Sequence, residues 1–150
     1  MGEGKKKEKV MREFSAGGVV FKKKKNEVFW LVTKSAASDL YPKQVWRLPK
    51  GWIDGNETTE NAALREVTEE GGVKAKVVKK IETVKYFFTT AEKVKILKFV
   101  TFYLMKWIKD LPDGFDDETS EIAWLPYQEA YKKLSFSGEK SILKKANELL

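Results

Sequence analysis

Three glutamates, at positions 66, 69 and 70, are the side chains whose type and spacing could do chemistry. They lie in the segment 51–73, which reads GWIDGNETTENAALREVTEEGGV. On a helix that turns by about 100° per residue, this i, i+3, i+4 spacing places Glu66, Glu69 and Glu70 on one face. Three like charges so close together raise one another's pKa unless a cation sits among them. Such a set of oxygen ligands suits Mg²⁺.

The apolar stripe of the same helix is expected to hold these glutamates at the edge of the protein body. The stripe consists of Ala63, Leu64, Val67 and Gly71. Glu70 falls beside Ala63, so the carboxylates border the buried face, and the sheet or a loop should overhang them. Arg65 can pair with Glu69 four residues on, or it can reach back to Glu57 and hold the preceding loop. From composition alone, a solvated helix face rich in glutamate is the alternative.

The chain of 150 residues contains neither histidine nor cysteine. This composition excludes Ser-His-Asp triads, thiol nucleophiles and zinc sites built from imidazole or thiolate. Enzymatic chemistry must then use carboxylates, lysine, arginine, tyrosine and hydroxyls, and carboxylates alone favour a hard cation such as Mg²⁺ or Mn²⁺. The 29 basic and 22 acidic side chains give a net charge of +7, which attracts polyanions such as nucleotides.

The elements that must position this segment follow from patterning. Strands are expected at 15–21, 27–33 and 45–49, a helix from a Thr58 cap to Gly71 with Gly72 as its stop, and further strands at 74–87, 94–107 and 120–125. Residues 51–56 are expected to be a loop. Helices are expected from Pro126 to about Leu134, and onward from a Ser137 cap. This order predicts an α/β fold in which helices cover both faces of a mixed sheet.

The length predicts one domain over residues 11–150, after a flexible basic tail at residues 1–10. No apolar run approaches the roughly 18 residues that a membrane-spanning helix needs. The lysine-rich start does not resemble a secretory signal, so we expect a cytoplasmic protein. The sequence leaves the oligomeric state, monomer or dimer, open.

The whole segment 51–73 resembles the Nudix box, G-x5-E-x7-R-E-U-x-E-E-x-G-U, where U is a bulky aliphatic residue. Its defined positions are filled, without departure, by Gly51, Glu57, Arg65, Glu66, Val67, Glu69, Glu70, Gly72 and Val73. The segments 16–20, 46–51 and 124–126 are similar to the family's first strand, the lead-in to its box and its C-terminal end. The resemblance implies the Nudix α/β/α sandwich, with a central mixed β-sheet, over about residues 12–150.

The resemblance also implies a metal-dependent hydrolase of substrates that contain a nucleoside diphosphate linked to another group. Glu69 and Glu70 would be metal ligands, Glu66 a ligand or the general base, and Arg65 and Glu57 orienting residues. Gly51 and Gly72 would have structural roles in the backbone of the box. Many members add a glutamate from a loop outside the box. Here we expect Glu118 in that role as ligand or base, with Glu121 as the alternative, because catalytic groups favour loops on a rigid scaffold.

Segments outside the box resemble the diadenosine polyphosphate hydrolase branch, which implies cleavage of diadenosine tetraphosphate to ATP and AMP. Tyr86 would then contact the phosphates or the base, and Phe136 would stack on adenine, although both could equally be core residues. Phosphate contacts are expected from Arg47, Lys50 and Lys34. The expected partner is a small nucleotide rather than a membrane, with nucleic acid not favoured.

Other substrates stay open at this point. They are oxidised dNTPs, RNA with a 5′-triphosphate, and diphosphoinositol polyphosphates, the last disfavoured because Trp52 stands where that branch usually has a second glycine. Two alternatives belong to other classes. One is a catalytically silent Nudix module that binds nucleotide or RNA, although such modules usually lose box glutamates. The other is a basic RNA-binding protein, for which Lys93, Lys95 and Lys98 supply no clear patch.

Overall fold

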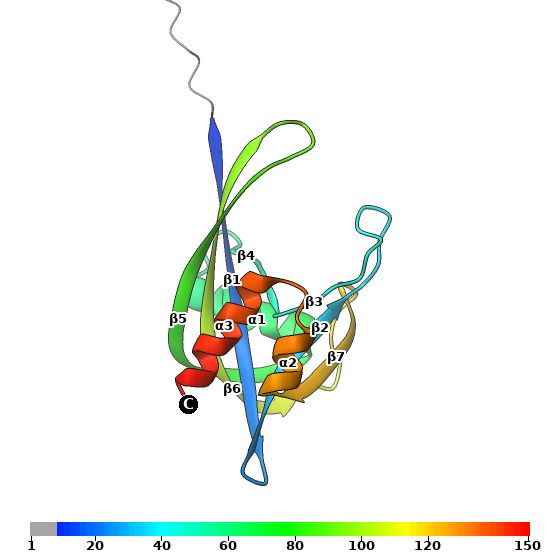
Figure 1. The fold of residues 1–150 in the computed structure, drawn as a ribbon, viewed down its shortest axis with the longest axis vertical. Coiled ribbons are helices and arrows are strands. Elements are labelled where there is room, and N and C mark those ends of the chain that lie inside the picture. Colours follow the sequence, from blue (N-terminus) through cyan, green and yellow to red (C-terminus); the bar gives the residue numbers. More distant parts are fainter. Residues whose placement is uncertain (1–8) are drawn as a thin grey trace, which may run out of the picture.

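The computed structural model describes residues 9–150 (Figure 1). Its strands are β1 (Val10–Lys24), β2 (Glu27–Ser35), β3 (Trp46–Arg47), β4 (Lys50–Trp52), β5 (Val73–Thr89), β6 (Lys95–Asp110) and β7 (Thr119–Pro126). Its helices are α1 (Thr59–Gly71), α2 (Tyr127–Lys133) and α3 (Ser137–Glu148). Most of the predicted tail lies outside the described residues, and β1 already begins inside its expected range, at Val10. No helix in the described part is long and apolar enough to cross a bilayer.

The strands form one mixed sheet, as predicted. Its order is β3-β2-β1-β6-β5, with β4 paired to β1 and β7 paired to β2. Strands β1 and β6 run parallel, and the other pairs are antiparallel. Strands β5 and β6 are longer than the expected 74–87 and 94–107, and their hairpin projects beyond the body in Figure 1.

Helices cover both faces of the sheet because successive strand residues point to opposite sides. Val20 and Leu31 pack in a cluster with residues of α1, whereas their neighbours Val19 and Val32 belong to a cluster that includes residues of α2 and α3. All four are fully buried. The expected three-layer α/β/α arrangement is therefore confirmed.

Helix α1 begins and ends as its sequence predicts. The Thr58 side chain accepts a hydrogen bond from the Asn61 amide at 3.1 Å, which caps the helix. Gly72 ends it with a φ of 68° and donates its amide to the Thr68 carbonyl. A Cβ at Gly72 would lie 2.6 Å from the backbone of Gly114, so this turn also allows the acidic loop to pass closely.

Two local predictions are wrong. Residues 50–52 form the short strand β4, paired to β1, so that Gly51 and Trp52 are strand residues where the loop 51–56 was expected to begin. Ser137 does not cap α3: the cap position is Phe136, which makes no side-chain capping bond, and Ser137 is the first helical residue. Glu139 in the first turn does not cap the helix with its carboxylate either, because that carboxylate accepts the Leu48 amide at 2.6 Å and pairs with Lys50.

Candidate active site

Glu66 and Glu69 of α1 face a cleft of about 500 Å³ beside strand β4. It is lined by Gly51, Trp52, Asp54, Arg65, Glu66, Glu69 and Glu118. Glu66 is 7% exposed, so its carboxylate lies at the buried edge that the apolar stripe predicts, whereas the Glu69 side chain is 42% exposed. Burial raises the pKa of Glu66, with the Arg65 charge opposing this and the neighbouring Glu69 and Glu118 charges adding to it.

Arg65 ties the loop before α1 to the glutamates, and it makes both contacts that the sequence left open. Its Nε and Nη2 donate to the two carboxylate oxygens of Glu57 at 2.8 and 3.0 Å. Nη2 also donates to the Trp52 carbonyl at 2.9 Å. Nη1 donates to Glu66 at 2.9 Å and to Glu69 at 3.1 Å. One guanidinium therefore fixes the loop, the strand end and two cleft carboxylates relative to one another.

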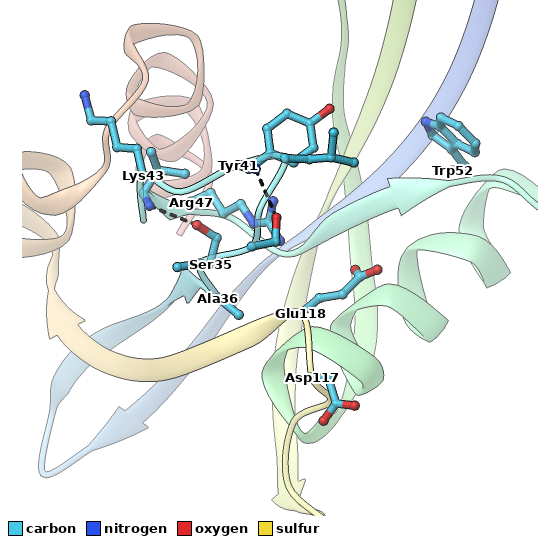
Figure 2. Close-up of a pocket in the computed structure, with 12 residues that line it drawn as sticks. Ser35, Ala36, Tyr41, Lys43, Arg47, Trp52, Asp117 and Glu118 are labelled. Carbon is cyan, nitrogen blue, oxygen red and sulfur yellow. Dashed lines mark hydrogen bonds between the residues drawn. The ribbon is translucent and has the colours of Figure 1, made fainter.

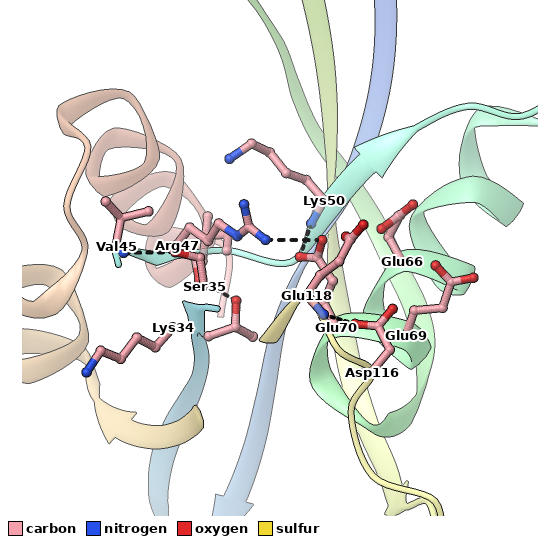
Figure 3. Close-up of polar contacts among 12 residues, drawn as sticks. Lys34, Ser35, Val45, Arg47, Lys50, Glu66, Glu69, Glu70, Asp116 and Glu118 are labelled. Atoms are coloured by element: carbon pink, nitrogen blue, oxygen red, sulfur yellow. Dashed lines mark hydrogen bonds and ion pairs between the residues drawn. The ribbon is translucent and has the colours of Figure 1, made fainter. Parts of the chain in front are cut away.

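Glu70 does not line this cleft, and its carboxylate lies between α1 and strand β4. It is 2% exposed, accepts the Lys50 amide at 3.2 Å, and lies 3.6 Å from Arg47 Nη2 (Figure 3). Burial raises the pKa of Glu70 to about 7, although the Arg47 charge opposes the shift. Glu70 is therefore an ion-paired buried group, while Glu66 and Glu69 face the cleft.

The loop 111–118 brings Glu118 to the same cleft. The Asp116 amide donates to the Glu69 carbonyl at 2.7 Å, and the Asp116 carboxylate accepts the Glu118 amide at 3.1 Å. Figure 3 shows the Glu118 side chain directed toward Glu66 and Glu69. Glu121 instead is exposed on β7, paired with Lys34 of β2. Of the two glutamates considered outside the box, the structure brings only Glu118 to the cleft.

The donor set of this cleft fits a hard divalent cation. It offers carboxylate oxygens and no nitrogen or sulfur ligand from histidine or cysteine, the chemistry that Mg²⁺ and Mn²⁺ prefer. A Cβ at Gly51 would lie 2.2 Å from the Glu66 carboxylate, so only glycine leaves that carboxylate its position. Within residues 9–150, no three acidic side chains are already grouped closely enough to hold an ion. Arg65 occupies oxygens of both Glu66 and Glu69 instead.

Cationic groups gather next to Glu70, on the side of the sheet that α3 covers. Lys50 Nζ pairs with Glu139 and lies 6.0 Å from the Phe136 ring centre. The Arg47 Nε is buried without a hydrogen-bond partner. Burial, with smaller effects from Lys50 and Arg47, lowers the pKa of Lys98. Three cations gathered at one place, with Glu70, Glu139 and Glu13 as their carboxylate neighbours, suit an anionic ligand.

Arg47 and Lys50 are predicted ligand contacts; of the other three, Tyr86 and Phe136 lie beside these cations, and Lys34 does not. Tyr86 is half-buried against the core, its pKa is raised by burial, and a Cβ at Gly138 would lie 2.9 Å from its hydroxyl. Phe136 is 47% exposed near Lys50. The Lys34 side chain points away from the carboxylates in Figure 3, so the structure does not bring it to the site.

Lys98 was missed as a site residue because its role depends on strand register. It lies opposite Tyr86 on β5 and Glu13 on β1, far apart in sequence. The one signal in the sequence is its place two residues before the buried Val100, because residues two apart in a strand point to the same face of the sheet.

The fold and this site define a member of the Nudix class. A sequence profile of the NUDIX domain matches residues 11–145. Because the match spans most of the chain, the chain belongs to the NUDIX family.

Individual relatives differ in what they are named for. The chain is 35% identical over 106 residues to the "Putative mutator protein MutT4" of Mycobacterium tuberculosis, covering 71% of this chain and 42% of that protein. It is 42% identical over 64 residues to an RNA pyrophosphohydrolase of Wolbachia, covering 42% of this chain and 36% of that protein. It is also similar to the crystal structure of a C. elegans Ap4A (diadenosine tetraphosphate) hydrolase, with a TM-score of 0.67, 25% identity, and coverage of 93% of this chain and 98% of that chain.

The matched segments span less than half the length of these two curated relatives. The sequence relatives are of the mutator and RNA pyrophosphohydrolase kinds, whereas the structural neighbour is a dinucleotide hydrolase. The diadenosine tetraphosphate branch therefore stays a prediction.

Proposed function

We propose that this chain is a metal-dependent Nudix pyrophosphohydrolase that cleaves a nucleoside polyphosphate by attack of water on phosphorus. The observation that carries the proposal is that a group of acidic side chains lies next to a group of basic ones. Glu66, Glu69 and Glu118 line an acidic cleft, and the cations Arg47 and Lys50 lie beside it around Glu70. Carboxylates are suited to a divalent cation, and the neighbouring cations are suited to the phosphates.

In this proposal Glu66, Glu69 and Glu118 would hold Mg²⁺, or alternatively Mn²⁺, and Glu70 would join them. When bound, the ion neutralises charge that develops on the phosphoryl oxygens. A carboxylate oxygen of Glu66 or Glu118 accepts the proton of the attacking water. Burial favours Glu66 as a base because it raises the pKa of that carboxyl. Arg65 holds Glu66 and Glu69 in place for these roles.

We propose diadenosine tetraphosphate as the substrate, cleaved asymmetrically to ATP and AMP. Water adds to one phosphorus, and the bridging oxygen of the broken P–O–P bond leaves with the other product. The exposed Phe136 ring beside Lys50 supports a base contact next to a phosphate contact. Tyr86 lies on the same side of the sheet. The similarity to the C. elegans Ap4A hydrolase over nearly its whole chain also supports this substrate.

A second candidate substrate is a nucleoside triphosphate, either free or at the 5′ end of RNA. The similarity to the mutator protein and to the RNA pyrophosphohydrolase favours it. The same carboxylates and cations would act, but only one base would need a binding site.

The test is a Mg²⁺-dependent hydrolysis assay with diadenosine tetraphosphate, 8-oxo-dGTP and triphosphorylated RNA, with products separated by ion exchange. Glu70→Gln is the inactive control, and Glu60→Gln, an exposed residue of the same helix, is the matched one. We expect ATP plus AMP, lost by several orders of magnitude in Glu70→Gln and retained in Glu60→Gln. Products only from the other two substrates would reject the dinucleotide. Near-normal activity of Glu70→Gln would reject the metal assignment, and no products from any substrate would favour a silent binding module.

A further inference from the structure

A second cleft, of about 680 Å³, opens next to the acidic one. The loop 35–45 forms one wall, and Trp52 of β4 and Glu118 complete it (Figure 2). Trp52 and Glu118 also line the acidic cleft, so the two clefts adjoin at these residues. The larger cleft has the size of a small-molecule site.

Large apolar side chains are exposed around this cleft. Leu40 is 85% exposed, Tyr41 75% and Trp52 63%. In Figure 2 the rings of Tyr41 and Trp52 stand apart on the side toward which the Glu118 carboxylate points. Exposed apolar side chains gathered at one concave place indicate a binding surface. Neither ring packs in the hydrophobic core, so core packing does not explain the position of either ring.

Hydrogen bonds fix the loop against the catalytic side of the molecule. The Ala36 amide donates to the Glu118 carbonyl at 2.9 Å, and Ser35 and Val45 exchange backbone and side-chain bonds of 2.8 and 2.9 Å across the loop base. At the tip, the Tyr41 amide donates to the Ser38 hydroxyl at 3.0 Å. The loop that carries Tyr41 is thus anchored to the residue that carries the cleft carboxylate.

We propose that Tyr41 and Trp52 form a nucleobase site for the second nucleoside of the substrate. This inference rests on the proposed function and extends it. The occupant follows from the adjacency of the two clefts: a polyphosphate in the acidic cleft would continue past Glu118 into this one. Arg47 and Lys43 in the cleft lining supply positive charge toward it. Phe136 does not line this cleft, so a base stacked there would be the other end of a dinucleotide.

Aromatic rings stack on any base, each contact being worth about 1–3 kcal/mol, or roughly 5- to 150-fold in affinity. The test therefore compares diadenosine tetraphosphate with adenosine 5′-tetraphosphate, which has the same phosphates and one nucleoside. The variants are Tyr41→Ala and Trp52→Ala. Phe87→Ala, a comparably exposed aromatic residue on β5 outside both clefts, is the matched control. The hydrogen bond from Arg65 is accepted by the backbone carbonyl of Trp52, so Trp52→Ala leaves it in place.

We expect each variant to raise the KM for the dinucleotide relative to that for the mononucleoside by roughly tenfold, and Phe87→Ala to leave this ratio unchanged. An unchanged ratio in both variants would overturn the inference while the proposed hydrolysis stands. If the wild type cleaves neither substrate, the proposed function fails by itself. The base site is then decided by quenching of intrinsic fluorescence on adding diadenosine tetraphosphate. Quenching that Trp52→Phe removes supports the site, and quenching that it leaves intact overturns it.

Discussion

Burial removes the Glu70 carboxylate from water and raises its pKa to about 7. A carboxyl whose pKa is about 7 in the folded state and 4.5 in the unfolded state binds its proton more tightly when folded. Its contribution to stability is therefore fully present at low pH and is lost as the pH rises from about 4.5 through about 7. Ionised Glu70 is a destabilising group unless a cation compensates it.

We therefore expect the free energy of unfolding to fall, between about pH 4.5 and pH 7, by on the order of 3 kcal/mol more in the wild type than in Glu70→Gln. Denaturant titrations at several pH values measure this difference. Mg²⁺ should raise the Tm of the wild type more at about pH 8 than at about pH 6, because binding requires the ionised carboxylate. Identical pH profiles for the two proteins would contradict the shifted pKa.

Phe136 tests whether an exposed aromatic residue at a helix start binds the base. Phe136→Ala should raise the KM for the nucleotide by roughly 5- to 150-fold and leave the Tm nearly unchanged, since the ring is half-exposed. Phe88→Ala, 42% exposed on β5, is the matched control. A lowered Tm with an unchanged KM would make Phe136 a packing residue instead.

At the scale of elements, the loop 53–58 and helix α1 act as one unit because Arg65 joins them. Glu57→Gln would remove one charge from the bidentate pair at 2.8 and 3.0 Å, and Arg65 would lose its anchor away from the cleft. We expect kcat to fall by roughly 10- to 100-fold, the usual effect of removing a partner of a metal ligand. Steady-state kinetics with excess Mg²⁺ would measure it.

Asp54→Asn is the matched control for this prediction. Asp54 also contacts Arg65, at 3.3 Å, but its side chain is 71% exposed and the pair is solvent-screened. Its kcat should stay within about twofold of the wild type. Equal losses in the two variants would mean that the loop's charge, rather than the Glu57 clamp, supports turnover.

The sequence predicted those elements whose local signals agree with the tertiary structure. Thr58 and Gly72 bound α1 because capping and a left-handed stop are local requirements. Ser137 failed as a cap because the first turn of α3 faces Leu48 and Lys50, and Glu139 serves those partners. The extra length of β5 and β6 follows from their pairing to each other, which a single-strand pattern does not contain.

The same distinction holds for the candidate site. The spacing within the box predicted that Glu66, Glu69 and Glu70 share one helix face; Glu66 and Glu69 line the cleft, whereas Glu70 is buried beside it against β4. The spacing could not predict that Arg47 and the Lys50 amide would engage Glu70, because those partners come from β3 and β4. The sequence likewise could not predict that Trp52 and Tyr41 line one cleft, because only the folded chain brings β4 and the loop 35–45 together.

At the scale of the whole molecule, the chain carries a net charge of +7, whereas the cleft of the candidate site is lined mainly by carboxylates. The net positive charge would attract a polyanionic substrate, and dissolved salt would screen this attraction. We expect kcat/KM for diadenosine tetraphosphate to fall several-fold between about 50 and about 300 mM salt at fixed Mg²⁺. A flat salt profile would mean that excess charge elsewhere on the surface does not guide the substrate.

Lys98 separates this general attraction from a specific phosphate contact. Its side chain is partly buried, and burial with the Lys50 and Arg47 charges lowers its pKa while the Glu13 and Glu139 charges oppose the shift, so bound phosphate would add counter-charge there. Lys98→Met should raise the KM by roughly tenfold and reduce the salt dependence of kcat/KM, because a charge-assisted hydrogen bond to phosphate is lost. Lys109→Met, an exposed lysine near the other end of β6, changes the net charge equally and should match the wild type in both measurements. Equal effects of the two substitutions would assign the attraction to net charge alone, since the two lysines differ in position and burial but not in charge.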